Sequence, residues 1–151
     1  MQKNFTAFGI FYRDNFYLTT AGNCIEYDGL KYTNSKFKSN SSGALIYPKL
    51  LDYNNGYENN KDYAIFYNRL VRKGLLIYDK DKEPKYVLGN TERKINFFKK
   101  FITATGGGSC SPILNSKCRL VGAVIKNNNQ YTPIEVVTEA IDKLIETTRE
   151  S

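Results

Sequence analysis

The chain has 151 residues, a length typical of one domain with its own hydrophobic core. Hydrophobic residues make up 41% and aromatic residues 14% of the chain, which excludes a disordered polypeptide. The 22 Lys and Arg residues outnumber the 15 Asp and Glu residues, but they are spread along the chain, so an ordinary solvated surface is favoured over a nucleic-acid footprint.

Short aromatic and β-branched runs dominate the first four-fifths of the chain and predict β-strands. Residues 6–12 and 16–20 are expected to form a hairpin that turns at Arg13-Asp14-Asn15. Further strands are expected at residues 30–32, 44–51, 62–67, 75–79 and 86–88, and a second hairpin at residues 113–114 and 119–125. The pattern of residues 95–104 fits either a helix or a strand, and a strand is favoured because strands surround it. Residues 39–43, 52–61 and 80–85 are rich in polar residues and are expected to be loops.

A different pattern ends the chain. Thr132, Pro133 and Glu135 have the spacing of a capping box with proline at the first helical position, which predicts a helix over residues 132–148. Apolar residues then recur at helical spacing, and we expect this stripe to face the core: Val137, Ala140, Ile141, Leu144 and Ile145. With no internal repeat, residues 1–151 are expected to form a single domain.

Special residues are most concentrated in residues 106–112, with the sequence GGGSCSP. Glycines allow backbone conformations with positive φ, and successive N–H groups in such a turn can bind an anion. The Ser109 hydroxyl stands where a nucleophile could lie, although a hydroxyl in such a turn can also simply bond local backbone.

The cellular location is expected to be cytoplasmic or otherwise intracellular. No apolar run is long enough to span a bilayer, so no membrane association is expected. The first residues, MQKNFTAFGIFYRDNF, lack the basic-then-apolar order of a signal peptide. Three cysteines without framework spacing suit free thiols in a reducing compartment.

Three segments together resemble the chymotrypsin-like (trypsin-fold) serine proteases. Residues 18–25, LTTAGNCI, resemble the segment LTAGHCI that carries the catalytic histidine, and residues 62–65, DYAI, resemble the strand that carries the aspartate. Residues 107–112, GGSCSP, resemble the segment GDSGSP that carries the serine. The three occur in the family's order, and residues 119–124 and 131–134 extend the resemblance over nearly the whole chain.

The resemblance implies an all-β fold with a C-terminal helix, arranged as a trimmed double β-barrel of the chymotrypsin/trypsin type. The barrels would occupy roughly residues 1–70 and 71–131, followed by the helix at 132–148. The short chain is closest to the disulfide-free intracellular and viral members, so a viral origin is an open possibility. No metal and no cofactor are expected.

The resemblance also assigns the site residues. Asn23 occupies the position of the catalytic histidine, Asp62 that of the aspartate and Ser109 that of the nucleophile. The N–H groups of Gly107 and Ser109 would form the oxyanion hole. Substrate-binding positions fall on Thr103 and on Ile125, Lys126 and Asn127.

Two departures from the family pattern bear on activity. An Asn amide cannot accept the serine proton as imidazole does, and the chain has no His anywhere. Loss of a triad member costs on the order of 10⁴ to 10⁶ in turnover. Gly108 and Cys110 also replace the family's Asp and Gly beside the serine, so the oxyanion hole is expected to be misshapen.

Cysteines raise a further alternative. Cys110 could be the nucleophile, as in viral cysteine proteases of this fold, but Pro112 has the family spacing from Ser109 and no cation near Cys110 is apparent to lower its pKa. Cys24 and Cys118 are expected to be small buried apolar residues.

Three functions remain open from the sequence. The first is a pseudoprotease that binds an extended peptide or protein segment in its cleft by strand addition. The second is an active serine endopeptidase disarmed by a His-to-Asn change at position 23. The third is a scaffold that binds RNA or another polyanion through its basic surface.

Overall fold

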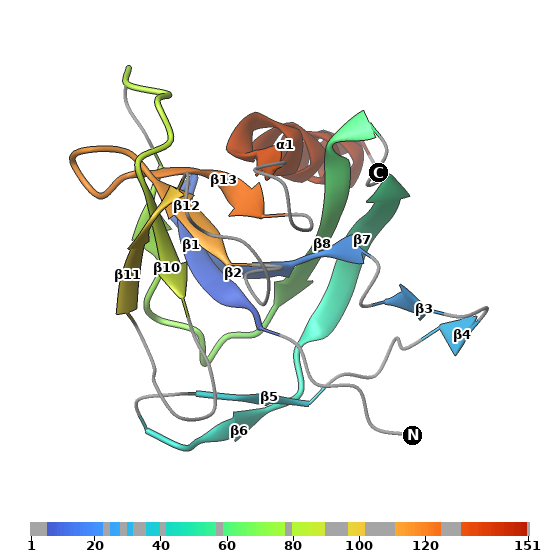
Figure 1. The fold of residues 1–151 in the computed structure, drawn as a ribbon. Helices are drawn as coiled ribbons and strands as arrows, with labels where there is room; N and C mark the ends of the chain where they lie inside the picture. Colours follow the sequence, from blue (N-terminus) through green and yellow to red (C-terminus); the bar gives the residue numbers. More distant parts are fainter. Residues whose placement is uncertain are drawn as a thin grey trace.

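The computed structural model describes residues 6–22, 25–27, 30–31, 36–39, 42–56, 59–77, 80–89, 97–101, 111–124 and 131–150. This part of the chain is mostly β-strand, and one α-helix ends it (Figure 1). The prediction of a β-rich fold with a C-terminal helix is therefore confirmed.

The first half of the chain builds a five-stranded sheet in the order β7-β8-β2-β1-β9. Its strands are β1 (Phe8–Tyr12), β2 (Asn15–Thr20), β7 (Lys49–Gly56), β8 (Lys61–Tyr67) and β9 (Leu75–Leu76). All neighbours are antiparallel except β9, which runs parallel to β1. Two short hairpins stand beside this sheet: β3 (Glu26–Tyr27) with β4 (Leu30–Lys31), and β5 (Phe37–Lys38) with β6 (Leu45–Ile46).

The second half builds another five-stranded sheet in the order β11-β10-β12-β13-β14, antiparallel throughout. Its strands are β10 (Tyr86–Gly89), β11 (Phe97–Lys100), β12 (Pro112–Leu114), β13 (Leu120–Val124) and β14 (Tyr131–Pro133). Over the described residues, neither five-stranded sheet closes on itself. The chain passes from one sheet to the other between Leu76 and Tyr86.

The largest hydrophobic core lies where the two sheets and the helix meet. It joins Ile10 and Ile65 of the first sheet to Leu120 of the second and to Ile141 of α1 (Ile134–Glu150). A separate core lies on the other face of β8, where Phe66 packs with Ala64 and Ile25, and the ring of Phe37 from β5 lies 4.9 Å from that of Phe66. The first sheet is thus covered on both faces.

Four of the five residues of the predicted stripe of α1 pack on the core, whereas Leu144 lines a groove beside the helix. Val137 and Ala140 are buried, as is Ile141, because the helix packs against β8, β13 and β14. The helix begins at Ile134, two residues later than expected, and runs to Glu150. Thr132 and Pro133 belong instead to β14, which pairs with β13.

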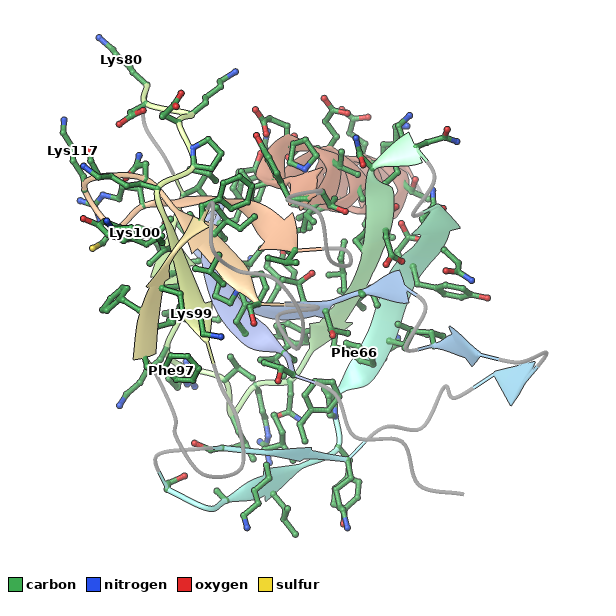
Figure 2. The ribbon with its side chains drawn as sticks, viewed as in Figure 1. Phe66, Lys80, Phe97, Lys99, Lys100 and Lys117 are labelled. Carbon is green, nitrogen blue, oxygen red and sulfur yellow. The ribbon has the colours of Figure 1, made fainter. Side chains whose placement is uncertain are left out.

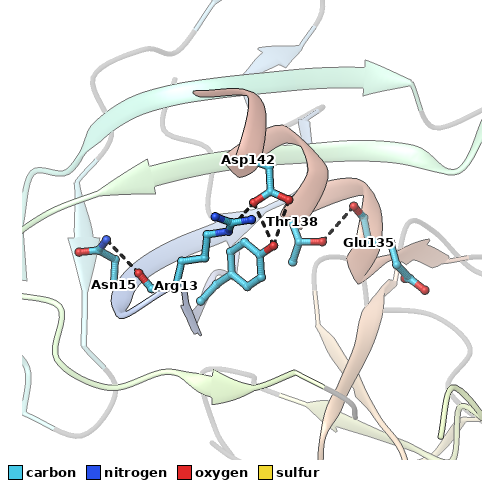
Figure 3. A network of polar contacts seen from close by, with 6 residues as sticks. Arg13, Asn15, Glu135, Thr138 and Asp142 are labelled. Carbon is cyan, nitrogen blue, oxygen red and sulfur yellow. Dashed lines mark hydrogen bonds and ion pairs between the residues drawn. The ribbon is translucent and has the colours of Figure 1, made fainter. Parts of the chain in front are cut away.

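Polar contacts join the same helix to the β1–β2 hairpin (Figure 3). The Tyr12 hydroxyl donates to both carboxylate oxygens of Asp142, at 3.0 and 3.1 Å, and Arg13 Nε lies 2.8 Å from Asp142 Oδ1. The hairpin turns at Arg13 and Asp14, whose φ angles of 50° and 62° are those of a type I′ turn. The turn was predicted at this place.

The expected loop at residues 52–61 is shorter than predicted. Strand β7 continues through Asn54 and Asn55 to Gly56, paired residue by residue with β8. Asparagine is a poor strand former, but pairing with a neighbouring strand overrides that preference. The strand expected at 44–51 is in turn divided at Tyr47 and Pro48 into β6 and β7.

Candidate functional site

Asp62, the one predicted catalytic residue that the structure describes, is the second residue of β8 and is only 3% exposed. Side chains alternate along this strand. Tyr63 and Ile65 face the core shared with α1, so Asp62 lies on the opposite face with Ala64 and Phe66. A buried carboxylate at the start of a central strand is held in one place by the sheet around it.

The hydroxyl of Thr132, in β14, makes two hydrogen bonds to the backbone of Asp62: it accepts one and donates the other. The N–H of Asp62 donates to Thr132 Oγ1 at 3.1 Å, and the same hydroxyl donates to the Asp62 carbonyl at 3.0 Å. Both residues are buried. Because β8 and β14 belong to different sheets, this pair of hydrogen bonds joins the two sheets at the position of the predicted acid.

Gly22, the residue before the predicted base position Asn23, packs closely against the backbones of β7 and β8. It follows β2, whose Thr20 pairs with Ala64 two residues from Asp62 along β8. A Cβ atom on Gly22 would come within 2.0 Å of the Asn54 carbonyl oxygen and 2.8 Å of that of Tyr63, so only glycine fits against these strands. The Ile25 N–H donates to the Gly22 carbonyl at 2.9 Å. Asn23 and Cys24 lie outside the described residues, between these two anchored neighbours.

Ser111 and Pro112 mark the end of the predicted nucleophile turn. Ser111 is buried, and its carbonyl accepts the Val124 N–H at 3.0 Å. Pro112 begins β12 opposite Ala123 of β13. Several predicted site residues before and after these strands lie outside the described part of the chain: Thr103, Gly107, Ser109, Cys110, Ile125, Lys126 and Asn127.

Strand pairing connects the acid position to the nucleophile turn. Asp62 is bonded to Thr132, Thr132 pairs with Ala123, and Ala123 pairs with Pro112. Neighbouring strands lie about 4.8 Å apart, so the backbones of Asp62 and Pro112 are within about 15 Å of each other. The structure therefore brings Asp62, Gly22 and Pro112 to one junction between the two sheets.

Sequence reasoning missed the role of Thr132 at this junction. A threonine before Pro-Ile-Glu has the pattern of a helix cap, and nothing in the local sequence indicates a partner seventy residues away. Cys118 was also predicted wrongly: it is an exposed free thiol in the β12–β13 hairpin, with a φ of 61°. The turn geometry of that hairpin places the side chain in solvent.

A groove of about 460 Å³ lies elsewhere, between β7, β8 and α1. It contains side chains of both charges, among them Asp52, Lys61, Glu139 and Lys143. The Tyr63 hydroxyl, which donates to Asp52 Oδ2 at 2.9 Å, also lines it. Lys61 and Tyr63 flank Asp62 in β8 and face away from it, so this groove is separate from the predicted site.

Metal ligands do not gather in the described residues, where no three His, Cys, Asp or Glu side chains are grouped as a metal site. No helix in that part of the chain is long and apolar enough to cross a membrane. Neither a scan against protein-family models nor a search of curated proteins found a match to this chain.

Proposed function

We propose that this chain is a trimmed trypsin-type double β-barrel whose cleft binds an extended peptide without cleaving it. One observation supports the proposal most: strand pairing brings Gly22, Asp62 and Pro112 to one junction between two sheets. These residues border or belong to the three segments that resemble the family's catalytic motifs. In this proposal each five-stranded sheet forms the body of one barrel.

The absence of cleavage follows from Asn23. A serine hydroxyl attacks a peptide carbonyl only when a base removes its proton, and an amide does not do so. The chain has no His that could act in its place. Asp62 then serves to hold the junction through its backbone and to accept hydrogen bonds from the Asn23 segment. In this proposal the Ser109 hydroxyl is a hydrogen-bonding group for the peptide and not a nucleophile.

Peptide binding would use the segments that continue from β11 and β13. The centroid of the Phe101 ring, next to β11, lies 5.7 Å from that of the Tyr131 ring, and in this proposal the two rings line one side of the pocket. Residues 125–127 follow Val124 of β13 and offer backbone groups for strand addition. Lys126 is the one charged residue among 101–105 and 125–127, so no strong selection for a charged peptide side chain is expected in the pocket.

A peptide display screen tests this proposal. Peptides enriched on the unmodified chain should bind equally to Thr147→Trp, a control on the exposed face of α1, and at least tenfold more weakly to Ser109→Trp, which fills the cleft. The proposal fails if no peptide is enriched, or if Ser109→Trp binds the peptides as well as the control does. It fails equally if the unmodified chain hydrolyses a peptide library.

A disarmed protease is the second candidate, favoured by the presence of both Asp62 and Ser109 beside an Asn of imidazole-like size. The variant Asn23→His discriminates between the two. If it reacts with a fluorophosphonate probe, and Asn23→His/Ser109→Ala does not, the chain is a serine endopeptidase lacking only its base. A folded Asn23→His variant that stays unlabelled supports natural loss of activity. An intracellular location, proposed with either function, accords with the exposed thiol of Cys118.

A further inference from the structure

The second sheet carries a basic surface at the end where β10 begins and β11 and β12 end. We call it the basic edge and define it by its seven cationic residues: Lys80, Lys82, Lys85, Lys99, Lys100, Lys117 and Arg119. Figure 2 shows Lys80, Lys117 and Lys100 on one side of the molecule and Lys99 close to Phe97, in contrast to the buried Phe66. In sequence these residues fall into three separate segments, which is why no basic motif is visible there.

Hydrogen bonds hold the three segments together. Asn115 is fully buried, and its Nδ2 donates to the Asp81 carbonyl at 2.8 Å while its Oδ1 accepts the N–H groups of Lys117 and Arg119. The Lys85 N–H donates to Leu114, and its carbonyl accepts from Phe101 at the end of β11. These hydrogen bonds therefore hold the backbone segments that carry the cations in fixed positions relative to one another.

Three acids lie at the basic edge among the residues that the structure describes. Asp81 and Glu83 lie within it, and the Asp81 carboxylate accepts hydrogen bonds from the Glu83 N–H at 3.0 Å and the Ser116 hydroxyl at 3.2 Å. Glu135 of α1 lies 3.4 Å from Lys82. In the described part of the chain, the seven cations of the basic edge therefore outnumber the acids beside them, in a chain whose total formal charge is +7.

Aromatic rings lie beside these cations on both faces of the edge strand β11, because side chains alternate along it: Phe98 and Lys100 share one face, and Phe97 and Lys99 share the other. Phe98 is 59% exposed on the edge strand, and its ring lies 6.0 Å from that of Tyr86. Lys85 Nζ lies 5.9 Å from the Tyr86 ring, and Lys99 Nζ lies 5.2 Å from the Phe97 ring. A solvated basic surface alone would not explain an exposed phenylalanine in its middle.

We propose that the basic edge binds single-stranded nucleic acid, with phosphates on the lysines and an unpaired base stacked on Phe98. Proteins that bind single strands combine a positive track for the backbone with aromatic platforms for the bases. A duplex would hide its bases from Phe98, whereas a single strand can offer them. The occupant is therefore a single strand, RNA or DNA.

The basic edge adjoins the proposed peptide pocket at Phe101. The Phe101 N–H donates to the Lys85 carbonyl, and its ring lies 5.7 Å from that of Tyr131 in β14. The two proposals use different side chains, so different variants test them: Ser109→Trp tests peptide binding, and Phe98→Ala tests nucleic-acid binding.

Fluorescence anisotropy with the full chain and labelled U20 and dT20 oligonucleotides tests this inference. The logarithm of the binding constant should fall linearly with that of the salt concentration, with a slope near −3 if about four phosphates are contacted. Lys99→Glu/Lys100→Glu should weaken binding at least tenfold, and Phe98→Ala about fivefold or more, with Phe98→Tyr retaining affinity. Comparing the two probes shows whether RNA or DNA is preferred.

Charge-matched variants provide the control. Lys36→Glu/Lys38→Glu changes the net charge equally on exposed residues around β5 and should leave binding within about twofold. The inference is overturned if this control weakens binding as much as Lys99→Glu/Lys100→Glu does, or if Phe98→Ala changes nothing. It is also overturned if anionic vesicles or an acidic peptide bind the basic edge while neither oligonucleotide does. If Lys99→Glu/Lys100→Glu unfolds the chain, Lys80→Ala/Lys117→Ala replaces it and should weaken binding at least fivefold.

Discussion

A single hydroxyl, that of Thr132, hydrogen-bonds both the N–H and the carbonyl of Asp62 and so joins strands of two different sheets. Thr132→Val keeps the shape of the side chain and removes both bonds, and it should lower the free energy of unfolding by about 2 to 3 kcal/mol, because buried backbone groups lose their partner. Urea denaturation measures the loss. Thr138→Val, which removes a bond within α1, is the control and should cost less than about 1 kcal/mol.

Stability should decrease with pH above about 10 because of Tyr63. Burial is the largest cause that raises the pKa of Tyr63 above its ordinary value of 10. The hydrogen bond to Asp52 and the negative charge of the Asp52 carboxylate raise it further. Below pH 10 both states keep the phenol proton; above it the unfolded state releases the proton and the folded state keeps it, so unfolding becomes easier by up to about 1.4 kcal/mol per pH unit. Urea denaturation from pH 8 to 11 should show a shallower decline for Tyr63→Phe. Tyr47→Phe, at an exposed position, should decline as the unmodified chain does.

The contacts between the β1–β2 hairpin and α1 should differ in their response to salt. Asp142→Asn removes the charge opposite Arg13, and because this ion pair is partly exposed, its effect on the melting temperature should shrink between 0.05 and 1 M NaCl. Tyr12→Phe removes a hydrogen bond to the same carboxylate, and its effect should stay nearly constant. Equal salt dependence of the two variants would contradict this division.

Asn115 should matter more to stability than any exposed residue of its hairpin. Asn115→Ala removes three side-chain hydrogen bonds at a fully buried position and should cost about 2 to 4 kcal/mol. Ser116→Ala removes one exposed bond to Asp81 and should cost less than about 0.5 kcal/mol. Both are measured from urea midpoints, and a comparable loss in the two variants would show that Asn115 does not organise the hairpin.

Gly22→Ala should be among the most damaging small substitutions in the chain. Its Cβ atom would meet backbone oxygen of Asn54, which cannot move without disturbing β7, so a loss of about 3 kcal/mol or more is expected in thermal or urea unfolding. Gly43→Asn is the comparison: Gly43 has a φ of 74° but open space around it, and asparagine tolerates that conformation. A loss below about 0.5 kcal/mol is expected there.

Local sequence patterns predicted the elements that depend on local interactions. The turn at Arg13 and Asp14 and the apolar stripe of α1 were both predicted, because turn formation and helical periodicity are properties of neighbouring residues. Asn54 and Asn55 were wrongly placed in a loop, since their strand exists through pairing with β8. Pairing over distance leaves no local pattern.

The candidate site divides in the same way. The strand expected at residues 62–67 is present as β8, and the described neighbours of Asn23 and Ser109 reach the same junction as Asp62. The burial of Asp62 was not predicted. The sequence does not predict the hydrogen bonds of Thr132 to Asp62, nor the convergence of three segments on the basic edge. Both join residues that are far apart in the chain.

The core shared by both sheets and α1 has a consequence for how the chain acquires its structure. Ile10 and Ile65 are covered by Leu120 and Ile141, which are synthesised much later. The first sheet therefore leaves the ribosome with an uncovered apolar face, and contacts of such long sequence separation form slowly. During synthesis the nascent chain depends on β13 and α1 to complete this core, and it is most prone to aggregation just before they emerge.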